Sequence, residues 1–134
     1  MSRWVGAKME GILIAAGTSQ LALGIWMAAW PASFFRVIGG FGLKNAHYVR
    51  DVSTIYLALA TTLLLSATRP GWRRPVLLVC AIQYAAHSVN HLVDAGAADP
   101  SWIGPFDLVL IAGTAVLFFY LFLVSNEGTK EGPP

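Results

Sequence analysis

The sequence is poor in cysteine. Its 134 residues include one cysteine, Cys80, which lies in a strongly apolar stretch. A disulfide within the chain needs two cysteines and a thiolate metal cluster needs several, so neither can supply stability or chemistry here. Cys80 is therefore predicted to be a small buried apolar residue.

Charged residues are scarce as well. They make up 12% of the chain, which is about half the share found in a soluble domain. Four stretches contain no Asp, Glu, Lys or Arg and run 25, 17, 19 and 19 residues, namely 11–35, 52–68, 75–93 and 108–126. Roughly 20 apolar residues cross the hydrocarbon core of a bilayer as a helix. The sequence therefore predicts an all-α integral membrane protein, an up-down bundle of four transmembrane helices.

Prolines and small polar residues set the expected helix bounds. The first three helices are predicted at 7–30, 47–68 and 75–94, and a fourth begins near Pro105. Pro75 follows a short turn and is tolerated in a first turn, while Ser101 is the predicted N-cap of the fourth helix. Residues 1–125 are expected to form a single transmembrane domain, and 126–134 a disordered tail.

Basic residues are distributed unevenly between the two predicted sides of the membrane. Four spans place both termini and the second connection on one side, which holds six of the nine basic residues: Arg3, Lys8, Arg69, Arg73, Arg74 and Lys130. The other side holds Arg36, Lys44 and Arg50. This asymmetry favours cytoplasmic termini. The net charge is only +2, and the basic residues lie at predicted helix ends, where they indicate membrane orientation. No nucleic-acid partner is therefore expected.

The third apolar stretch ends in a polar stripe. Its last turns carry two imidazoles, an amide and a carboxylate at i, i+3, i+4 and i+7: His87, Asn90, His91 and Asp94. This spacing puts the four side chains on one helical face, and Gln83 extends that face one turn deeper. Ionisable groups inside a transmembrane segment are costly and usually face the protein interior, which makes the stripe a candidate site.

Other helices bring polar residues to the same expected depth. The second helix opens with His47, Arg50 and Asp51, and the fourth with Asp107. The first helix carries Gln20 between two glycines. We predict an outer-leaflet cavity with catalytic candidates Asp51, His87, His91, Asp94 and Asp107. The ligand-binding candidates are His47, Arg50, Gln20, Gln83 and Asn90.

Several kinds of chemistry are open to this set of residues. The polar groups can form a purely structural network of ion pairs and interhelical hydrogen bonds. His87 and His91 at i, i+4 can bind a metal ion with Asp94, Asp51 or Asp107 completing the shell. A bis-histidine haem would need His47 opposite a histidine of the third helix. A carboxylic acid beside an imidazole can also isomerise, cyclise or hydrolyse a lipophilic substrate. The residues specify no cofactor.

The order of features resembles a family of small membrane proteins. The first predicted helix ends in Trp30-Pro31 and is followed by Phe34-Phe35 and a glycine-rich connection. Arg50-Asp51 then precedes an apolar helix, and His91 lies further on. In this order the features resemble small four-helix bacterial membrane proteins of the DoxX-like group. The resemblance spans roughly 11–94. It implies a multi-pass protein of the bacterial plasma membrane, often accessory to a redox or quinone-linked system. The missing cysteine pair argues against a thiol-redox role.

Two main functional hypotheses follow. In the first, the outer-leaflet pocket binds a small lipophilic molecule from the bilayer, with acid/base conversion as an extension. In the second, the polar stripe meets a larger membrane protein, or a second copy of this chain, and the protein is a non-catalytic accessory subunit. A cavity lined by His87 and His91 favours the first hypothesis, whereas a stripe on an outer face favours the second.

Overall fold

Helices are the only regular secondary structure in the part of the chain that the structure describes. The computed structural model covers residues 3–125, with side chains from residue 7 onward, and has no strand in this range beyond one isolated bridge. Its helices are α1 (Arg3–Ala29), α2 (Pro31–Val37), α3 (Ala46–Thr68), α4 (Pro70–Val93) and α5 (Ile103–Val124). α1, α3, α4 and α5 are long and apolar enough to cross a membrane, which confirms the predicted helical class. The tail predicted to be disordered lies outside the described residues.

Local sequence explains most helix bounds. Pro31 opens α2, because a proline at the first position gives up an N–H that would have no partner there. Asn45 caps α3: its Oδ1 accepts hydrogen bonds from the backbone N–H groups of His47 and Tyr48 at 3.1 and 3.2 Å. α3 ends at Thr68, shortly before Pro70, which opens α4 in the same way as Pro31 opens α2.

One predicted helix start and one predicted N-cap are wrong. α4 begins at Pro70, and Pro75 lies inside it. Because Pro75 is still near the helix start, its missing N–H leaves one early carbonyl unpaired and does not break the helix. Trp102, not Ser101, occupies the N-cap position of α5, and no side chain caps it. The backbone closes this turn instead, with Ile103 N–H donating to the Pro100 carbonyl at 3.1 Å.

The long helices pack chiefly as two pairs, α1 with α3 and α4 with α5. Two glycines of α1 let α3 come close: a Cβ on Gly17 would lie 2.8 Å from Leu64 Cγ, and one on Gly24 would lie 2.8 Å from Leu57 Cδ2. In the second pair the ring of Tyr84 packs against that of Phe118 with 5.5 Å between centroids. Each pair therefore has its own tight seam.

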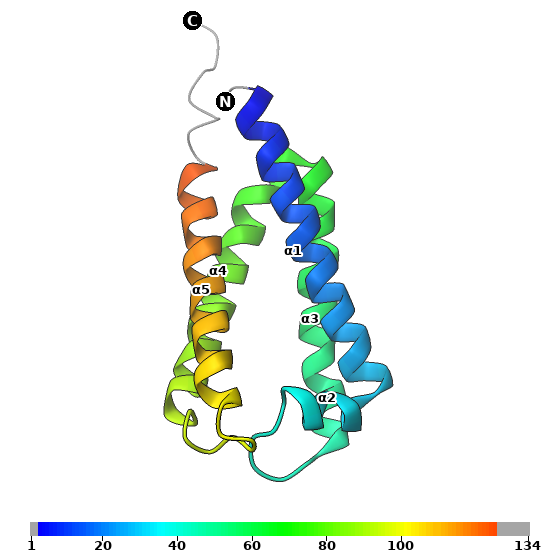
Figure 1. The fold of residues 1–134 in the computed structure, drawn as a ribbon. Coiled ribbons are helices and arrows are strands. Elements are labelled where there is room, and N and C mark those ends of the chain that lie inside the picture. Colours follow the sequence, from blue (N-terminus) through cyan, green and yellow to red (C-terminus); the bar gives the residue numbers. More distant parts are fainter. Residues whose placement is uncertain (1–2, 126–134) are drawn as a thin grey trace, which may run out of the picture.

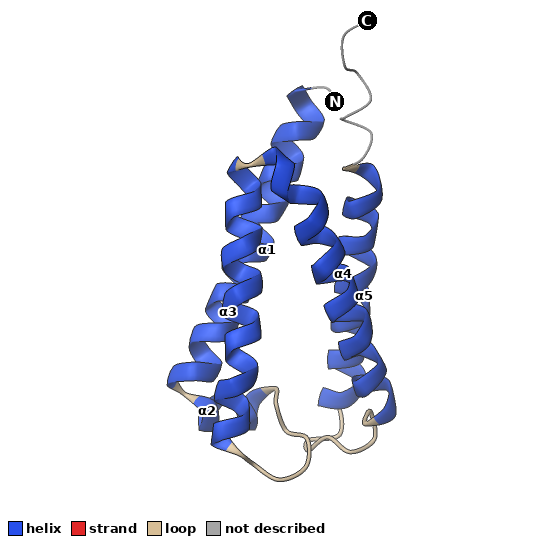
Figure 2. Cartoon of the chain, turned by 180° about the vertical axis from the view of Figure 1, so that it is seen from behind, coloured by secondary structure: helices blue, strands red, loops and turns tan. Residues whose placement is uncertain are grey.

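The two pairs are joined at one end of the molecule and separate toward the other (Figures 1 and 2). The short α3–α4 turn marks the joined end. At the opposite end α2 and the connections 38–45 and 94–102 lie between the pairs. Asp99 N–H donates to the Gly40 carbonyl at 2.9 Å, and a Cβ on Gly40 would lie 2.3 Å from the Asp99 carbonyl oxygen. Glycine at position 40 therefore lets the two connections approach closely enough for this hydrogen bond, which links the separated ends of the two helix pairs.

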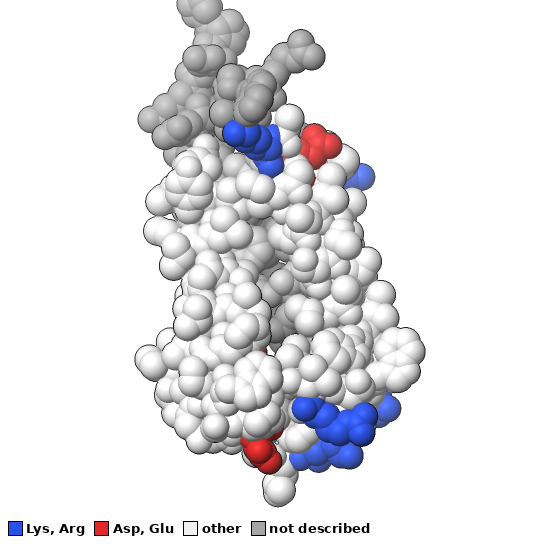
Figure 3. Space-filling model, viewed as in Figure 1, with Lys and Arg blue, Asp and Glu red and all other residues white. Residues whose placement is uncertain are grey.

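Charge and apolar surface are segregated along the molecule. In Figure 3 the Lys, Arg, Asp and Glu side chains gather near the two ends, and the face between them is almost entirely uncharged. Large apolar side chains are exposed on the long helices, among them Ile25, Val79, Val109 and Val116. Such a surface is costly in water and suits a hydrocarbon environment.

Candidate functional site

A cavity of about 510 Å³ lies between the two helix pairs. All five helices and the α2–α3 connection line it, and in Figure 3 the surface is hollowed between the two halves of the molecule. Its walls are largely apolar, with Leu23 and Met27 from α1 and Leu110 and Leu117 from α5. Polar side chains enter from all four long helices: Gln20, Tyr56, Tyr84, His87, His91 and Asp107. The volume and this mixture are typical of small-molecule sites.

Gln20 and Tyr84 connect the helix pairs across the cavity. Gln20 is 5% exposed, and its Nε2 donates a hydrogen bond to the Tyr84 hydroxyl. The Gln20 Oε1 atom is buried and has no hydrogen-bond partner among the described residues. Buried polar atoms nearly always have a partner, so this oxygen is an unusual unsatisfied acceptor on a side chain that lines the cavity.

Two imidazoles form one wall of the cavity. His87 and His91 meet edge to face with 4.7 Å between ring centroids, and the Phe41 ring packs on His91 at 4.9 Å. Phe41 belongs to the α2–α3 connection, so that segment helps to fix the orientation of His91. The His91 Nδ1 atom is buried and also lacks a partner within the described part of the chain. This nitrogen is therefore a second unsatisfied polar atom on a cavity-lining side chain.

Asp107 contributes the only carboxylate of the cavity lining. It belongs to α5 and is 7% exposed. It lies within electrostatic range of Tyr56 on α3, and no described residue donates a hydrogen bond to it or pairs with it in a salt bridge. A carboxylate inside apolar walls is costly unless a proton, a cation or hydrogen-bond donors compensate it.

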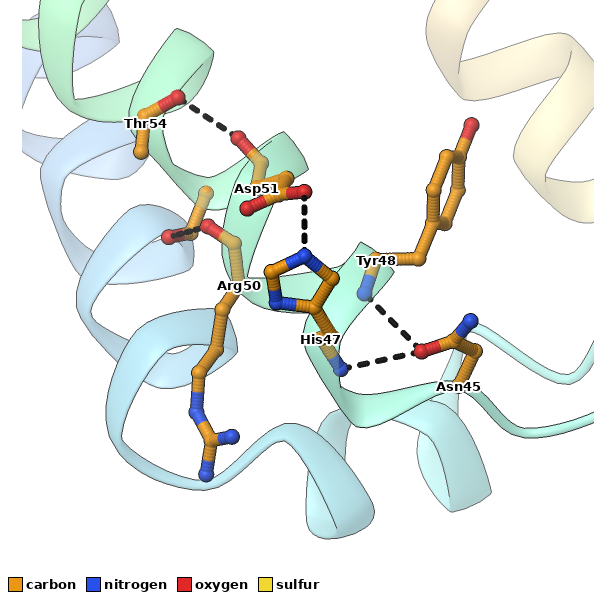
Figure 4. A network of polar contacts seen from close by, with 7 residues as sticks. Asn45, His47, Tyr48, Arg50, Asp51 and Thr54 are labelled. Atoms are coloured by element: carbon orange, nitrogen blue, oxygen red, sulfur yellow. Dashed lines mark hydrogen bonds and ion pairs between the residues drawn. The ribbon is translucent and has the colours of Figure 1, made fainter.

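Asp51 does not face the interior, contrary to prediction. Its side chain is 63% exposed and pairs with His47, itself 86% exposed, at 3.4 Å (Figure 4). Arg50 points away from this pair in the same view. The predicted rotation of α3 was wrong because the face that packs inward carries Val49 and Ser53, and residue 51 lies about 200° around the helix from residue 49.

The predicted stripe on α4 divides. His87 and His91 line the main cavity, whereas Asn90 and Asp94 are exposed. Gln83 lines a separate cavity of about 10 Å³ between α3 and α4. The face of α4 that lines the main cavity carries Tyr84, His87 and His91. The predicted stripe therefore contains two residues of this face, and its other residues lie beside the face. The stripe was predicted to cover a wider part of the helix surface than the part that lines the cavity.

No metal centre forms in the described residues. They contain no group of three or more His, Cys, Asp or Glu side chains that could hold an ion. The proposed set of His87, His91 and Asp94 is not brought together, because Asp94 is exposed at the C-cap of α4. His47 lies outside the cavity lining, so it does not oppose the two imidazoles as a haem ligand would have to.

Sequence reasoning missed the tyrosines. Tyr56 and Tyr84 line the cavity, and Tyr84 holds Gln20. A signal was available: Tyr84, His87 and His91 follow at i, i+3 and i+7, which places polar-tipped side chains on one face of an apolar helix. Phe41 gave no such signal, because the connection that carries it has no periodic pattern.

Comparison with known protein families, curated proteins and solved structures finds no match for this chain. Membership of the DoxX-like group accordingly stays a prediction, and any function has to be argued from the cavity itself.

Proposed function

We propose that this protein is a multi-pass protein of the bacterial plasma membrane that binds a small lipophilic molecule in the cavity between its two helix pairs. The four long helices form an up-down bundle in the bilayer with both termini in the cytoplasm. The polar groups around His91 and Asp107 then lie toward the outer leaflet. The bound molecule exchanges with the bilayer.

The cavity is the single observation that carries this proposal. Its apolar walls suit a lipophilic body, while the polar side chains of the lining, among them His87 and the unpaired Asp107, offer positions for a polar group. Apolar walls with a few oriented polar groups are the usual composition of a ligand site. The positions of His87 and His91 favour a pocket protein over an accessory subunit, because both line the cavity.

Acid/base conversion of the bound molecule is a second candidate function. The presence of Asp107, His87 and His91 in one cavity favours it, since a carboxyl group and an imidazole can pass a proton to and from a substrate. If the protein converts its ligand, the wild type should copurify with the product and the Asp107→Asn variant with the unconverted substrate. The two bound molecules should then differ in mass or isomeric form. Identical bound molecules in both would argue for binding alone.

The binding proposal is tested by blocking the cavity from α5. Leu110 lines the cavity, whereas its neighbour Val109 is 73% exposed and does not. In phosphatidylcholine nanodiscs, equilibrium dialysis with anthracene should detect saturable binding above that of empty discs. Leu110→Trp should lower it several-fold by filling space, and Val109→Trp should not. Equal binding by the two variants, or none by the wild type, would contradict the proposal.

A further inference from the structure

We propose that the ligand is a lipophilic organic cation, whose positive charge pairs with the Asp107 carboxylate against the aromatic wall of the cavity. This inference rests on the proposed binding function and adds the charge of the ligand. It follows from three features of the lining: one carboxylate, no Lys or Arg to pair with it, and several aromatic rings.

The charges of the lining are unbalanced. Asp107 is its only acidic residue, and none of its members is Lys or Arg. Arg36 and Lys44 are close in sequence to the residues of α2 and the α2–α3 connection that line the cavity. Both are exposed and lie outside the lining. A carboxylate between apolar walls with no Lys or Arg in the lining is expensive to keep ionised, because both the low dielectric and the missing permanent cation act against it. A cationic ligand supplies the missing partner.

Aromatic rings surround the same space. Phe34, Phe35 and Phe41 approach from the α2 side, and Tyr48 and Tyr56 from α3. The face of an aromatic ring attracts a cation, and the attraction grows when water is excluded. A cavity lined by one carboxylate and several aromatic rings is therefore better suited to an organic ammonium or phosphonium group than to a neutral alcohol.

The lining offers no Lys or Arg side chain for an anionic group of a ligand. A zwitterionic phospholipid fits poorly, because its phosphate would find no Lys or Arg in the lining.

The route of entry fits an amphiphilic molecule. Leu110 and Leu117 of α5 line the cavity and are 57% and 42% exposed, so the cavity reaches the outer surface along this helix. That surface is apolar. A cation that partitions into the bilayer with its hydrocarbon part can therefore reach Asp107 without crossing a polar barrier.

The test uses the full chain in phosphatidylcholine nanodiscs with tetraphenylphosphonium as probe, measured by equilibrium dialysis with empty discs subtracted. We expect saturable binding to the wild type. Asp107→Asn should weaken it by at least about tenfold, as expected for loss of a desolvated charge pair. Asp107→Glu should retain it within a few-fold. Asp51→Asn is the matched control, because it removes an exposed carboxylate outside the cavity, and it should leave binding unchanged.

Two further measurements test the charge preference of the cavity and its integrity in the Asp107→Asn variant. Tetraphenylborate has the same shape and the opposite charge, so wild-type protein should not bind it saturably; this comparison needs no variant. Anthracene binding by Asp107→Asn reports that the cavity is intact. Equal binding of phosphonium by wild type and Asp107→Asn, saturable binding of tetraphenylborate, or a copurifying phospholipid that phosphonium fails to displace would each overturn the inference. Retained anthracene binding in those cases would leave the proposed function standing.

Discussion

Arg73 shows how a single residue can differ from its expected role. Its charge counts toward the predicted membrane orientation, yet the side chain is buried, 8% exposed. Arg73 Nε donates to the Ser66 carbonyl at 3.2 Å and Nη2 to the Ala67 carbonyl at 2.8 Å. These carbonyls belong to the last turn of α3, where no helical N–H follows to bond them. Arg73 therefore holds the end of one helix from the start of the next.

Arg73→Met should destabilise the protein by about 1.5–3 kcal/mol, the usual worth of hydrogen bonds to a charged group, because methionine keeps an apolar stem but donates nothing. The free energy of unfolding in mixed micelles, followed by circular dichroism, measures this loss. Arg36→Met, at an exposed position at the end of α2, is the control and should change little. Equal stability of the two variants would remove the capping role.

At the scale of elements, the seam between α1 and α3 depends on missing side chains. Gly17 and Gly24 lie two turns apart on α1, and each faces a leucine of α3 together with its backbone nitrogen at 3.2 Å. Close backbone approach strengthens dispersion contacts between helices in a membrane, where the hydrophobic effect does not drive association. This seam also sets the rotation of α3, and with it the outward position of Asp51.

Gly24→Leu should weaken this seam. The new side chain would meet Leu57 and the backbone behind it, and overpacking of this kind costs about 1–3 kcal/mol. Gly11→Leu is the matched control on the same helix, since a Cβ there meets nothing within 4 Å. It should be neutral or slightly stabilising, because leucine is a better helix former than glycine. Thermal unfolding in detergent compares the two, and a Gly24→Leu variant as stable as Gly11→Leu would contradict close packing.

For the whole molecule, the ends carry the charge and the middle carries the apolar surface. Arg3, Lys8, Arg69, Arg73 and Arg74 belong to the end with the α3–α4 turn, whereas Arg36, Lys44 and Arg50 belong to the other end. The excess of Lys and Arg marks the cytoplasmic side of a membrane protein. Lys130, which contributes to the predicted asymmetry, lies outside the described residues.

Cysteine labelling tests this orientation in intact cells. In a Cys80→Ala background, Asp99→Cys should react with a membrane-impermeant maleimide added from outside. Gly71→Cys, at an exposed position in the first turn of α4, should react only after permeabilisation. The reverse pattern would place the termini outside, and the polar end of the cavity would then face the cytoplasmic leaflet.

The sequence by itself determined what depends on neighbouring residues. Hydropathy and the positions of Pro31 and Pro70 defined four long apolar helices, because helix formation and termination are local. His87 and His91 were predicted together for the same reason, since a spacing of four residues brings side chains together in any helix.

Tertiary packing decided everything that depends on how a helix is rotated and what it meets. Asp51 and Asp94 are exposed while Asp107 lines the cavity, although all three are carboxylates near helix ends. The pairing of Gln20 with Tyr84 joins residues on α1 and α4 that are 64 positions apart. Rotation is set by the best contact between whole helix faces, such as the glycine seam of α1 on α3, and no local pattern in either helix contains that information.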